Sequence, residues 1–461
     1  MANKPRFFKP SRQTAKRQLP AKPVEAEILN FSHDLRGVAR IEGKPVFIDN
    51  ALPGERVRFR YTDRRARFDE GQLLEVLEPA DNRCAPRCAH IDACGGCSLQ
   101  HLQPAAQIAE KERILLDQLS RIGEVAVPEL LPPLTGASFG YRRKARIGLR
   151  VQRPAKGRGE SKSSPVFGFR AKRSNELVDI RECHVLHPTV AERIPELRQL
   201  VAGSEGRAHF THLEVAVGED AAALVLRHTR PLSEADRRRW CQFAVDSGLH
   251  LYLQPGEAAS AHRVWPEGGA ERLSYSLPEF DLTLGFHPLD FVQVNFEINR
   301  QMVARAVALL DPRPGERVLD LFCGLGNFTL PLARHAGQVI GVEGEGALTA
   351  RAEENAAAND IDNAQFVTAD LTADMRGHGW ASGGFHKVLL DPPRAGAVEV
   401  LPQLARLQPQ RIVYVSCNPS TLARDAGELA RLGYHLQRAG VMDMFPHTAH
   451  VESIAVFEPV L

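Results

Sequence analysis

The sequence predicts a multidomain α/β protein that ends in a doubly wound, Rossmann-like sheet. From about residue 291, strand-like runs alternate with helical runs, which is typical of parallel strands joined by helices. Near the N-terminus, short alternating segments lie between Gly, Pro and Asn turns, which indicates a small OB-like β-barrel. The length of 461 residues fits about three domains at roughly 150 residues each.

The predicted elements follow this order along the chain. The barrel strands are expected at 24–29, 36–40, 44–48, 55–60 and 71–76. The central part holds a helix at 107–122 and strands at 141–151 and 166–170, with an unusually long loop at 154–165. The C-terminal strands are expected at 317–322, 339–343, 365–367, 387–390, 411–416 and 451–457. The predicted domains are a basic disordered arm (1–22), the barrel (23–80), a central α/β domain (81–290) and the sheet domain (291–461).

Composition excludes several classes of protein. With 25% charged and 43% hydrophobic residues, the chain is neither mainly disordered nor fibrous. No apolar run approaches the roughly 18 residues of a membrane span. The basic N-terminus lacks the apolar stretch of a secretory signal, and it is poorer in serine than a mitochondrial transit peptide. We therefore expect a cytoplasmic protein without membrane contact.

Two basic segments point to a polyanion partner. Residues 1–24 carry seven basic side chains and no acid, and Arg142 to Arg158 carry eight and no acid. Such runs are often solvated loops, but two of them in one chain favour nucleic acid.

The eight cysteines are unevenly distributed. Cys84, Cys88, Cys94 and Cys97 lie within fourteen residues, whereas the other four are scattered. In a cytosolic chain, clustered cysteines indicate a metal or redox site rather than structural disulfides. Spacing alone permits a tetrahedral zinc site made of these four.

A glycine turn follows the first strand of the C-terminal domain. Gly324 and Gly326 permit a tight turn and close backbone approach to a ligand, although such a turn is often only structural. Thr329 occupies the position of the third glycine of a dinucleotide fingerprint, so dinucleotides fit less well. Glu343 and Asp370 follow the next two strands, where they can reach ribose and adenine. This arrangement suits S-adenosylmethionine.

The reacting centre is predicted at the ends of later strands. Asp391-Pro-Pro-Arg394 forms a rigid turn, in which Arg394 replaces the aromatic residue typical of base amino-methylating enzymes. Cys417 follows the next strand, and Glu452 lies at the start of the last one. A lone cysteine there is usually inert, but beside the Asp391 turn it is a candidate nucleophile. Its thiolate can add to C6 of uracil and activate C5 for methylation, after which Glu452 takes the C5 proton.

These motifs resemble the RNA uracil-C5 methyltransferases. The resemblance rests on Leu321–Pro331, Asp391–Arg394, Ser416–Pro419, His450–Ser453 and Phe291–Asn295. It implies a class I methyltransferase domain that binds S-adenosylmethionine, with Cys417 as nucleophile and Glu452 as base. The positions that match cofactor-binding residues of the family are Gln293, Phe322, Asn327, Glu343, Asp370 and Asp391.

The N-terminal half resembles the 23S rRNA branch of the same family. Residues 24–78, with the turn Ala51-Leu-Pro-Gly-Glu55, are similar to a TRAM RNA-binding domain. The resemblance implies a [4Fe–4S] cluster held by Cys88, Cys94, Cys97 and the distant Cys183, with Cys84 outside the family pattern. It implies 23S rRNA as partner, one modified uracil (the family site is uracil-1939), and a monomer without an obligate protein partner.

Two alternatives stay open at this point. The same chemistry on another rRNA site or on tRNA would use the same cofactor and nucleophile. A non-catalytic RNA-binding iron–sulfur protein would not need Gln293, Glu343, Asp391, Cys417 and Glu452 together.

Overall fold

The computed structural model describes residues 19–151, 165–373, 375 and 378–459. The chain divides into two compact units, Met1–Cys84 and Ala85–Leu461, which are described separately. The predicted basic arm lies almost wholly outside the described residues, as do the 154–165 loop, except for its last residue, and the end of the second basic run.

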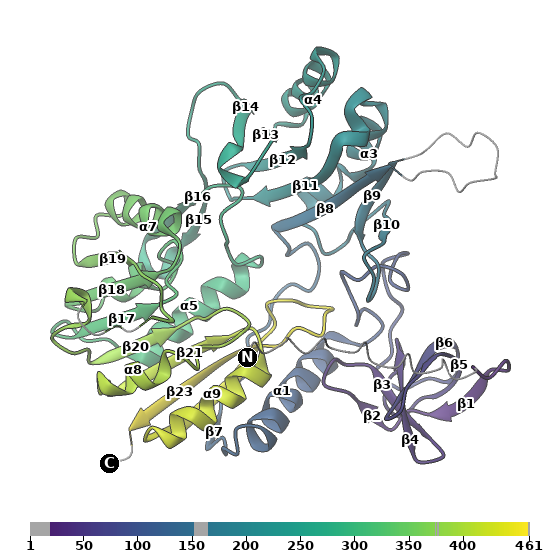
Figure 1. The fold of residues 1–461 in the computed structure, drawn as a ribbon, viewed down its shortest axis with the longest axis horizontal. Helices are drawn as coiled ribbons and strands as arrows, with labels where there is room; N and C mark the ends of the chain where they lie inside the picture. Colours follow the sequence, from purple (N-terminus) through teal and green to yellow (C-terminus); the bar gives the residue numbers. More distant parts are fainter. Residues whose placement is uncertain (1–18, 152–164, 374, 376–377, 460–461) are drawn as a thin grey trace, which may run out of the picture. The chain divides into compact units, whose positions relative to one another are not determined.

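The first unit is a single six-stranded sheet in the order β1-β5-β6-β4-β3-β2 (Figure 1). Its strands are β1 Val24–Glu27, β2 Asn30–Phe31, β3 Gly37–Ile41, β4 Lys44–Asp49, β5 Arg56–Arg64 and β6 Asp69–Glu78. Alternation directs Val57, Phe59 and Tyr61 of β5 into a core with Ile28 and Ile48. The predicted strands are therefore confirmed.

The 51–55 turn closes this unit around a buried carboxylate. Gly54 adopts a φ of +84°, which favours glycine. The carboxylate of Glu55, which is fully buried, accepts the Leu52 N–H at 2.8 Å and the Arg83 guanidinium Nη2 at 2.8 Å. A buried charge needs such partners, so the turn depends on Glu55.

A seven-stranded sheet forms the centre of the second unit, in the order β10-β9-β8-β11-β12-β13-β14. Its strands are β8 Lys144–Val151, β9 Pro165–Arg170, β10 Leu177–Asp179, β11 Phe210–Val217, β12 Ala222–His228, β13 His250–Gln254 and β14 His262–Trp265. Its helices are α2 Pro188–Ala191, α3 Ile194–Gly203 and α4 Glu234–Ser247. Trp240 of α4 is fully buried in the core that these elements share.

An eight-stranded sheet follows, in the order β19-β18-β17-β20-β21-β23-β22-β7 (Figure 1). Its strands are β7 Glu129–Leu130, β17 Arg317–Leu321, β18 Gln338–Glu343, β19 Ala364–Thr368, β20 Lys387–Leu390, β21 Arg411–Ser416, β22 Tyr434–Met442 and β23 Glu452–Pro459. The helices of this layer are α1 Pro104–Arg121, α5 Phe296–Leu310, α6 Thr329–Ala333, α7 Gly346–Ala358, α8 Leu401–Arg406 and α9 Pro419–Arg431. The first five strands in this order are parallel, which confirms the doubly wound prediction.

Two strands of this sheet were not predicted. β22 contains a register shift between Leu436 and Arg438, which breaks the alternation that would have revealed it. β7 has only two residues and comes from far upstream in the chain. The chain at β7 can approach β22 closely because residue 440 is glycine. A Cβ at this position would lie only 2.8 Å from the Cβ of Leu131. Helix α1 packs beside it, against α9 and β22.

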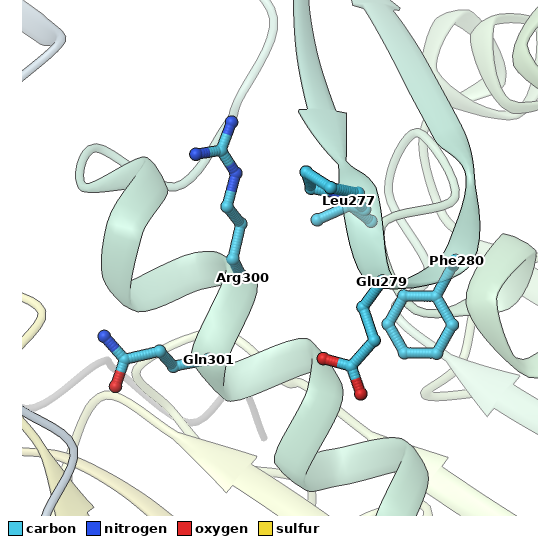
Figure 2. A pocket seen from close by; sticks show the side chains of 6 residues that line it. Leu277, Glu279, Phe280, Arg300 and Gln301 are labelled. Atoms are coloured by element: carbon cyan, nitrogen blue, oxygen red, sulfur yellow. The ribbon is translucent and has the colours of Figure 1, made fainter.

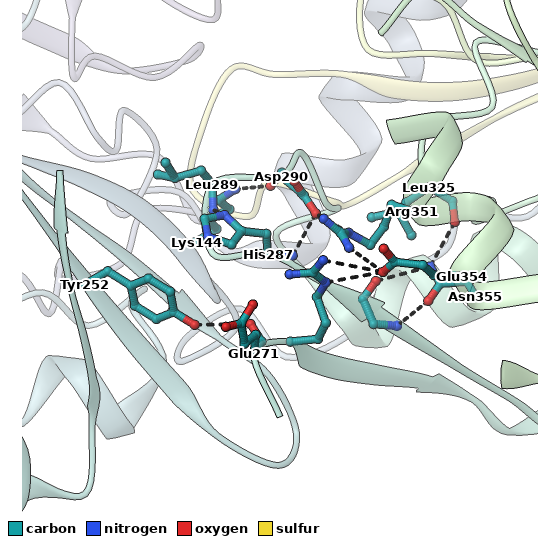
Figure 3. A network of polar contacts seen from close by, with 12 residues as sticks. Lys144, Tyr252, Glu271, His287, Leu289, Asp290, Leu325, Arg351, Glu354 and Asn355 are labelled. Carbon is teal, nitrogen blue, oxygen red and sulfur yellow. Dashed lines mark hydrogen bonds and ion pairs between the residues drawn. The ribbon is translucent and has the colours of Figure 1, made fainter. Parts of the chain in front are cut away.

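A hairpin, β15 Leu273–Leu277 and β16 Leu282–Phe286, joins the two sheets. Beyond it, a polar network fixes the chain that carries Gln293 (Figure 3). Arg351 of α7 donates to the Asp290 carboxylate at 3.1 Å, and Asn355 of the same helix donates to the Leu325 carbonyl at 3.1 Å. The network thus connects this segment with the glycine loop.

Within the described part of the chain, no helix combines the length and the apolar character needed to cross a membrane.

Candidate active site

Several predicted site residues meet at one edge of the eight-stranded sheet. Phe322 and Asp391 directly follow β17 and β20, and Glu343 is the last residue of β18; both β18 and β20 pair in parallel with β17. The carboxyl ends of parallel strands form the usual ligand-binding edge of such sheets. The structure therefore brings these three residues together.

The glycine loop is strained at this edge. Phe322 adopts a φ of 64°, although it is not glycine, and Gly324 and Gly326 have φ values of 55° and 94°. A side chain held in the left-handed region costs energy and is often found at ligand sites. A Cβ at Gly324 would meet nothing within 4 Å, so open space lies above the loop.

Glu343 holds the loop in place. Its carboxylate accepts backbone N–H groups from Gly324 at 3.1 Å, Gly344 at 2.7 Å and Glu345 at 3.2 Å. These bonds fix the Glu343 carboxylate at the carboxyl edge of the sheet, where the sequence predicts that it accepts hydrogen bonds from ribose hydroxyls.

The remaining predicted cofactor residues differ in their surroundings. The Asn327 amide is bonded to Asn299 at 2.9 Å and to the Tyr275 hydroxyl at 2.8 Å. Asp370 is exposed, and its carboxylate accepts the backbone N–H and hydroxyl of Thr372. Gln293 is partly buried and makes no side-chain hydrogen bond to another described residue. Asn327 thus supports the loop, and Asp370 caps a turn at the sheet edge.

The Asp391 turn is fixed against the start of helix α9. The side chains of Asn418 and Thr421 donate to the Arg394 carbonyl at 3.1 and 3.3 Å. The Asp425 carboxylate accepts the Ala397 N–H at 2.7 Å. A Cβ on the neighbouring Gly396 would lie 2.5 Å from this carboxylate, so only glycine fits there. These contacts hold the turn beside the strand that ends at Cys417.

Cys417 and Glu452 lie opposite each other. The antiparallel register of β21 and β23 ends at Ser416 paired with Ser453, and the next position places Cys417 across from Glu452. The Ser453 hydroxyl donates to the Ser416 carbonyl at 3.2 Å and locks this register. Cys417 and Glu452 are the residues just beyond this last pair, and the charge of Glu452 acts on the Cys417 thiol, so the two side chains are candidates for contact with one substrate ring.

The electrostatics of this edge favour protonated groups. Burial raises the pKa of the Cys417 thiol to about 11; Glu452 and Asp391 act in the same direction, and Arg394 opposes them. Burial, with Asp391, raises the pKa of Glu452 to about 8, against Arg394 and Lys111. Burial raises the pKa of Asp391 to about 7. A pKa near neutrality suits proton transfer, so Glu452 and Asp391 are candidates for that role.

A contact between Arg394 and His450 at this site was not predicted from the sequence. The Arg394 guanidinium donates to Nδ1 of His450 at 2.9 Å. Burial and the nearby Arg394, Lys111 and Arg142 lower the pKa of His450 to about 4, so the ring is neutral and accepts this bond. His450 belongs to the motif His450–Ser453, but its distance from Arg394 in the sequence gives no sign that the two side chains meet.

The four predicted cluster cysteines come from two distant segments, and their thiols influence one another's pKa values. Cys94 forms an isolated antiparallel bridge with Ala171. Burial, with Cys94 and Cys88, raises the pKa of Cys97 to about 11, and burial, with Cys97 and Cys94, raises that of Cys183 to about 12.

Backbone N–H groups reach the sulfur atoms of this cysteine group. The His90 N–H donates to Cys88 Sγ and the Gly96 N–H to Cys94 Sγ, each at 3.4 Å. Among the described residues, no three or more His, Cys, Asp or Glu side chains are arranged to hold a single metal ion. The zinc alternative with Cys84 therefore finds no support in the geometry.

A separate pocket of about 230 Å³ lies between the hairpin and helix α5 (Figure 2). Its walls include Leu277, Glu279, Phe280, Arg300 and Gln301. None of the predicted site residues lines it, so it has no part in the chemistry considered above.

Two family descriptions match the chain. "tRNA (Uracil-5-)-methyltransferase" covers residues 281–459, and "TRAM domain" covers residues 18–74. The first match contains every predicted catalytic and cofactor residue, and the second coincides with most of the six-stranded sheet.

Similar proteins extend these matches to nearly the full length. A 23S rRNA (uracil(1939)-C(5))-methyltransferase RlmD from Alcanivorax borkumensis is 50% identical over 443 residues, covering 96% of this chain and 98% of the relative. The RlmD of Alkalilimnicola ehrlichii is 52% identical over 444 residues, covering 96% and 98%. The solved structure of Pyrococcus abyssi tRNA (uracil-54, C5)-methyltransferase with S-adenosyl-L-homocysteine has a TM-score of 0.71 and 24% identity, covering 94% of this chain and 99% of that chain, which shows a shared fold.

Proposed function

Because this chain belongs to the RlmD family of RNA uracil-C5 methyltransferases, we propose that it forms 5-methyluridine in 23S rRNA with S-adenosylmethionine as methyl donor. The target would be the family site, uracil-1939, which the names of the relatives specify. The observation that carries the chemistry is the placement of Cys417 opposite Glu452, beside Asp391 at the edge of the sheet.

The residues at the edge fit S-adenosylmethionine. Glu343 offers a fixed carboxylate for ribose hydroxyls, and the open glycine loop leaves space beside it. The Asp391 carboxylate has no hydrogen-bond partner among the described residues and is free to bind a positive group. Gln293 and Phe322 would complete the binding site, with Asn327 supporting it and Asp370 at its outer end. When bound, the cofactor supplies an electrophilic methyl group next to a sulfonium charge.

The chain's own residues would act in sequence. Cys417 gives its proton to water, and its thiolate forms a bond to C6 of uracil. The C5–C6 double bond breaks in this step, and its electron pair makes C5 nucleophilic. After C5 carries the methyl group, Glu452 removes the C5 proton and the Cys417–C6 bond breaks, so that the thiolate leaves. Because both residues must reach one base, the target uracil is expected to be flipped out of its stack.

RNA recognition is assigned to the parts outside the catalytic edge. The six-stranded sheet matches a TRAM domain; on its strand β5, Arg56 and Arg60 are exposed and Arg58 is half-buried. Arg56 and Arg58 pair with the carboxylate of Glu25, so phosphate would compete with these exposed ion pairs. A second candidate substrate is tRNA, because the match to residues 281–459 carries that name.

The substrate can be tested by tritium release. Purified protein should release tritium from [5-³H]uridine-labelled 23S rRNA fragments, and mass spectrometry should place one methyl group at uracil-1939. Release from labelled tRNA alone would overturn the rRNA assignment and support the tRNA alternative. No release from either RNA would overturn the proposed activity.

We also propose a [4Fe–4S] cluster held by Cys88, Cys94, Cys97 and Cys183. Their mutual electrostatic effects and the backbone N–H groups directed at sulfur fit thiolates that share one cluster.

Replacing Cys183 by alanine should remove the cluster. The anaerobically purified wild type is expected to be brown with about four irons per chain, as its cluster type requires, and the variant nearly colourless. Cys241→Ala is the matched control, since Cys241 is a partly buried cysteine on helix α4. A colourless wild type with stoichiometric zinc, or a C183A protein that keeps its iron, would contradict the assignment.

A further inference from the structure

Lys111 is a fully buried cation next to the catalytic edge. It lies on helix α1, and its ammonium donates to the Asp443 carboxylate at 2.7 Å and to the Phe445 carbonyl at 3.0 Å. Lysine is almost never fully buried unless it is paired. Such a residue needs a structural or functional reason, and neither the sequence motifs nor the proposed mechanism has used it.

The position of this ion pair connects it with Glu452. Met442 is the register partner of Glu452 in the β22–β23 pair, and Asp443 is the next residue. The titratable groups whose charges act on Glu452 are Asp391, Cys417, Arg394 and Lys111, and the Asp443 carboxylate is paired with Lys111. The first two oppose ionisation of Glu452, and the two cations favour it.

A second polar residue on the same helix fixes the loop after β22. Gln107 lies one turn before Lys111 and is fully buried. Its amide oxygen accepts the His447 N–H at 2.8 Å, and its amide nitrogen contacts Nδ1 of the same ring at 3.1 Å. Residues four apart share a helix face, so α1 holds the loop 443–450 at two points. This loop leads directly to Glu452.

We propose that Lys111 is a positioning residue whose ammonium anchors the loop before Glu452 and favours the carboxylate form of that residue. This inference rests on the proposed function, in which Glu452 accepts the C5 proton. Asp443 and the Phe445 carbonyl fix where the ammonium lies, and Asp443 directly follows Met442, the register partner of Glu452. An anionic base beside Asp391 would otherwise be repelled by a second carboxylate.

The proposal predicts a shifted pH profile in Lys111→Met. Without the cation, Glu452 should ionise at a pH higher by about one unit, the lower end of the effect of a nearby opposite charge. Proton release from C5 should then fall about tenfold at neutral pH and recover at alkaline pH. Lys111→Gln, which keeps a donor but lacks the charge, should give the same shift. Lys111→Arg should restore the wild-type profile.

Lys387→Met is the matched control. Lys387 is also buried, and its ammonium pairs with Glu316 at 2.7 Å, but it begins β20 at the end opposite to Asp391. We expect a similar loss of melting temperature without a change in the pH profile. If K111M and K387M shift the profile alike, or if K111M and K111Q keep the wild-type profile, the proposal is overturned.

A measurement without RNA separates this proposal from the proposed function. Infrared difference spectra against pH should contain a carboxylic acid band that is absent in Glu452→Gln. The midpoint of that band should lie higher in K111Q than in the wild type. This shift in a protein that releases no tritium from any RNA would support the role of Lys111 and overturn the substrate assignment. If K111Q leaves the midpoint unchanged while the wild type methylates RNA, the role of Lys111 is overturned and the proposed function is supported.

Discussion

Replacing Cys417 by alanine is expected to reduce methyl transfer to background. Without the sulfur, C5 of uracil has no nucleophilic character, so the loss should exceed about 10⁴-fold, as when other enzymes lose their covalent nucleophile. The clearest measurement uses 5-fluorouridine in the 23S rRNA fragment together with S-adenosylmethionine. Fluorine at C5 cannot be removed as a proton, so the wild type should stay joined to RNA through Cys417 after denaturation.

The adduct must depend on this one thiol. Cys417→Ala should form none, whereas Cys241→Ala should form as much as the wild type, since Cys241 lies on α4 of the central sheet. An adduct that persists in C417A would show that another nucleophile acts. Absence of any adduct with the wild type, despite cofactor binding, would mean that the reaction does not proceed through C6 addition.

Replacing Glu452 by glutamine should separate the two halves of the reaction. Addition and methylation can still occur, but the amide cannot accept the C5 proton, so methylated RNA should remain bound to Cys417. A general base contributes about 10²- to 10⁴-fold, and turnover should fall by that amount. The measurement is a denaturing gel with ordinary uridine RNA, on which E452Q should show a stable complex and the wild type little.

The pH dependence provides the control for this variant. Glu452 is effective only when ionised, and burial with Asp391 raises its pKa to about 8. Product release by the wild type should therefore fall as pH decreases through 8 and rise towards a plateau above it. If product release by the wild type does not fall as pH decreases through 8, or if E452Q turns over normally, another group takes the C5 proton. Asp391 would then be the next candidate.

Most of the fold could be predicted because local patterns and packing agree. The strands of the C-terminal sheet are short apolar runs, which a buried parallel strand requires, and all six predicted ones are present. In the N-terminal sheet, β5 alternates between buried and more exposed residues over most of its length. β22 and β7 escaped prediction because a register shift hides one and a partner from a distant part of the chain creates the other.

Some features of the candidate site could likewise be predicted from the sequence, and others could not. Cys417 and Asp391 follow parallel strands, Glu343 ends one, and Glu452 begins the antiparallel β23, so topology alone brings all four to one edge. The Arg394–His450 contact and the buried Lys111 depend on a loop conformation and on a helix from another part of the chain. Sequence spacing contains no information on either. These contacts nevertheless set the charge around the nucleophile and the base.

The short strand β7 has a consequence for how such enzymes can be divided or recombined. The chain leaves the eight-stranded sheet after β7, builds the central sheet from β8 to β14, and returns through helix α5. The central sheet is therefore an insertion with two covalent tethers rather than an appended module. A fragment that began at residue 281 would lack α1 and β7, and would expose both the apolar side of α9 and an open sheet edge. Exchange of the central sheet between relatives thus needs two junctions, one on each side of that sheet, and a single cut would leave an aggregation-prone catalytic half.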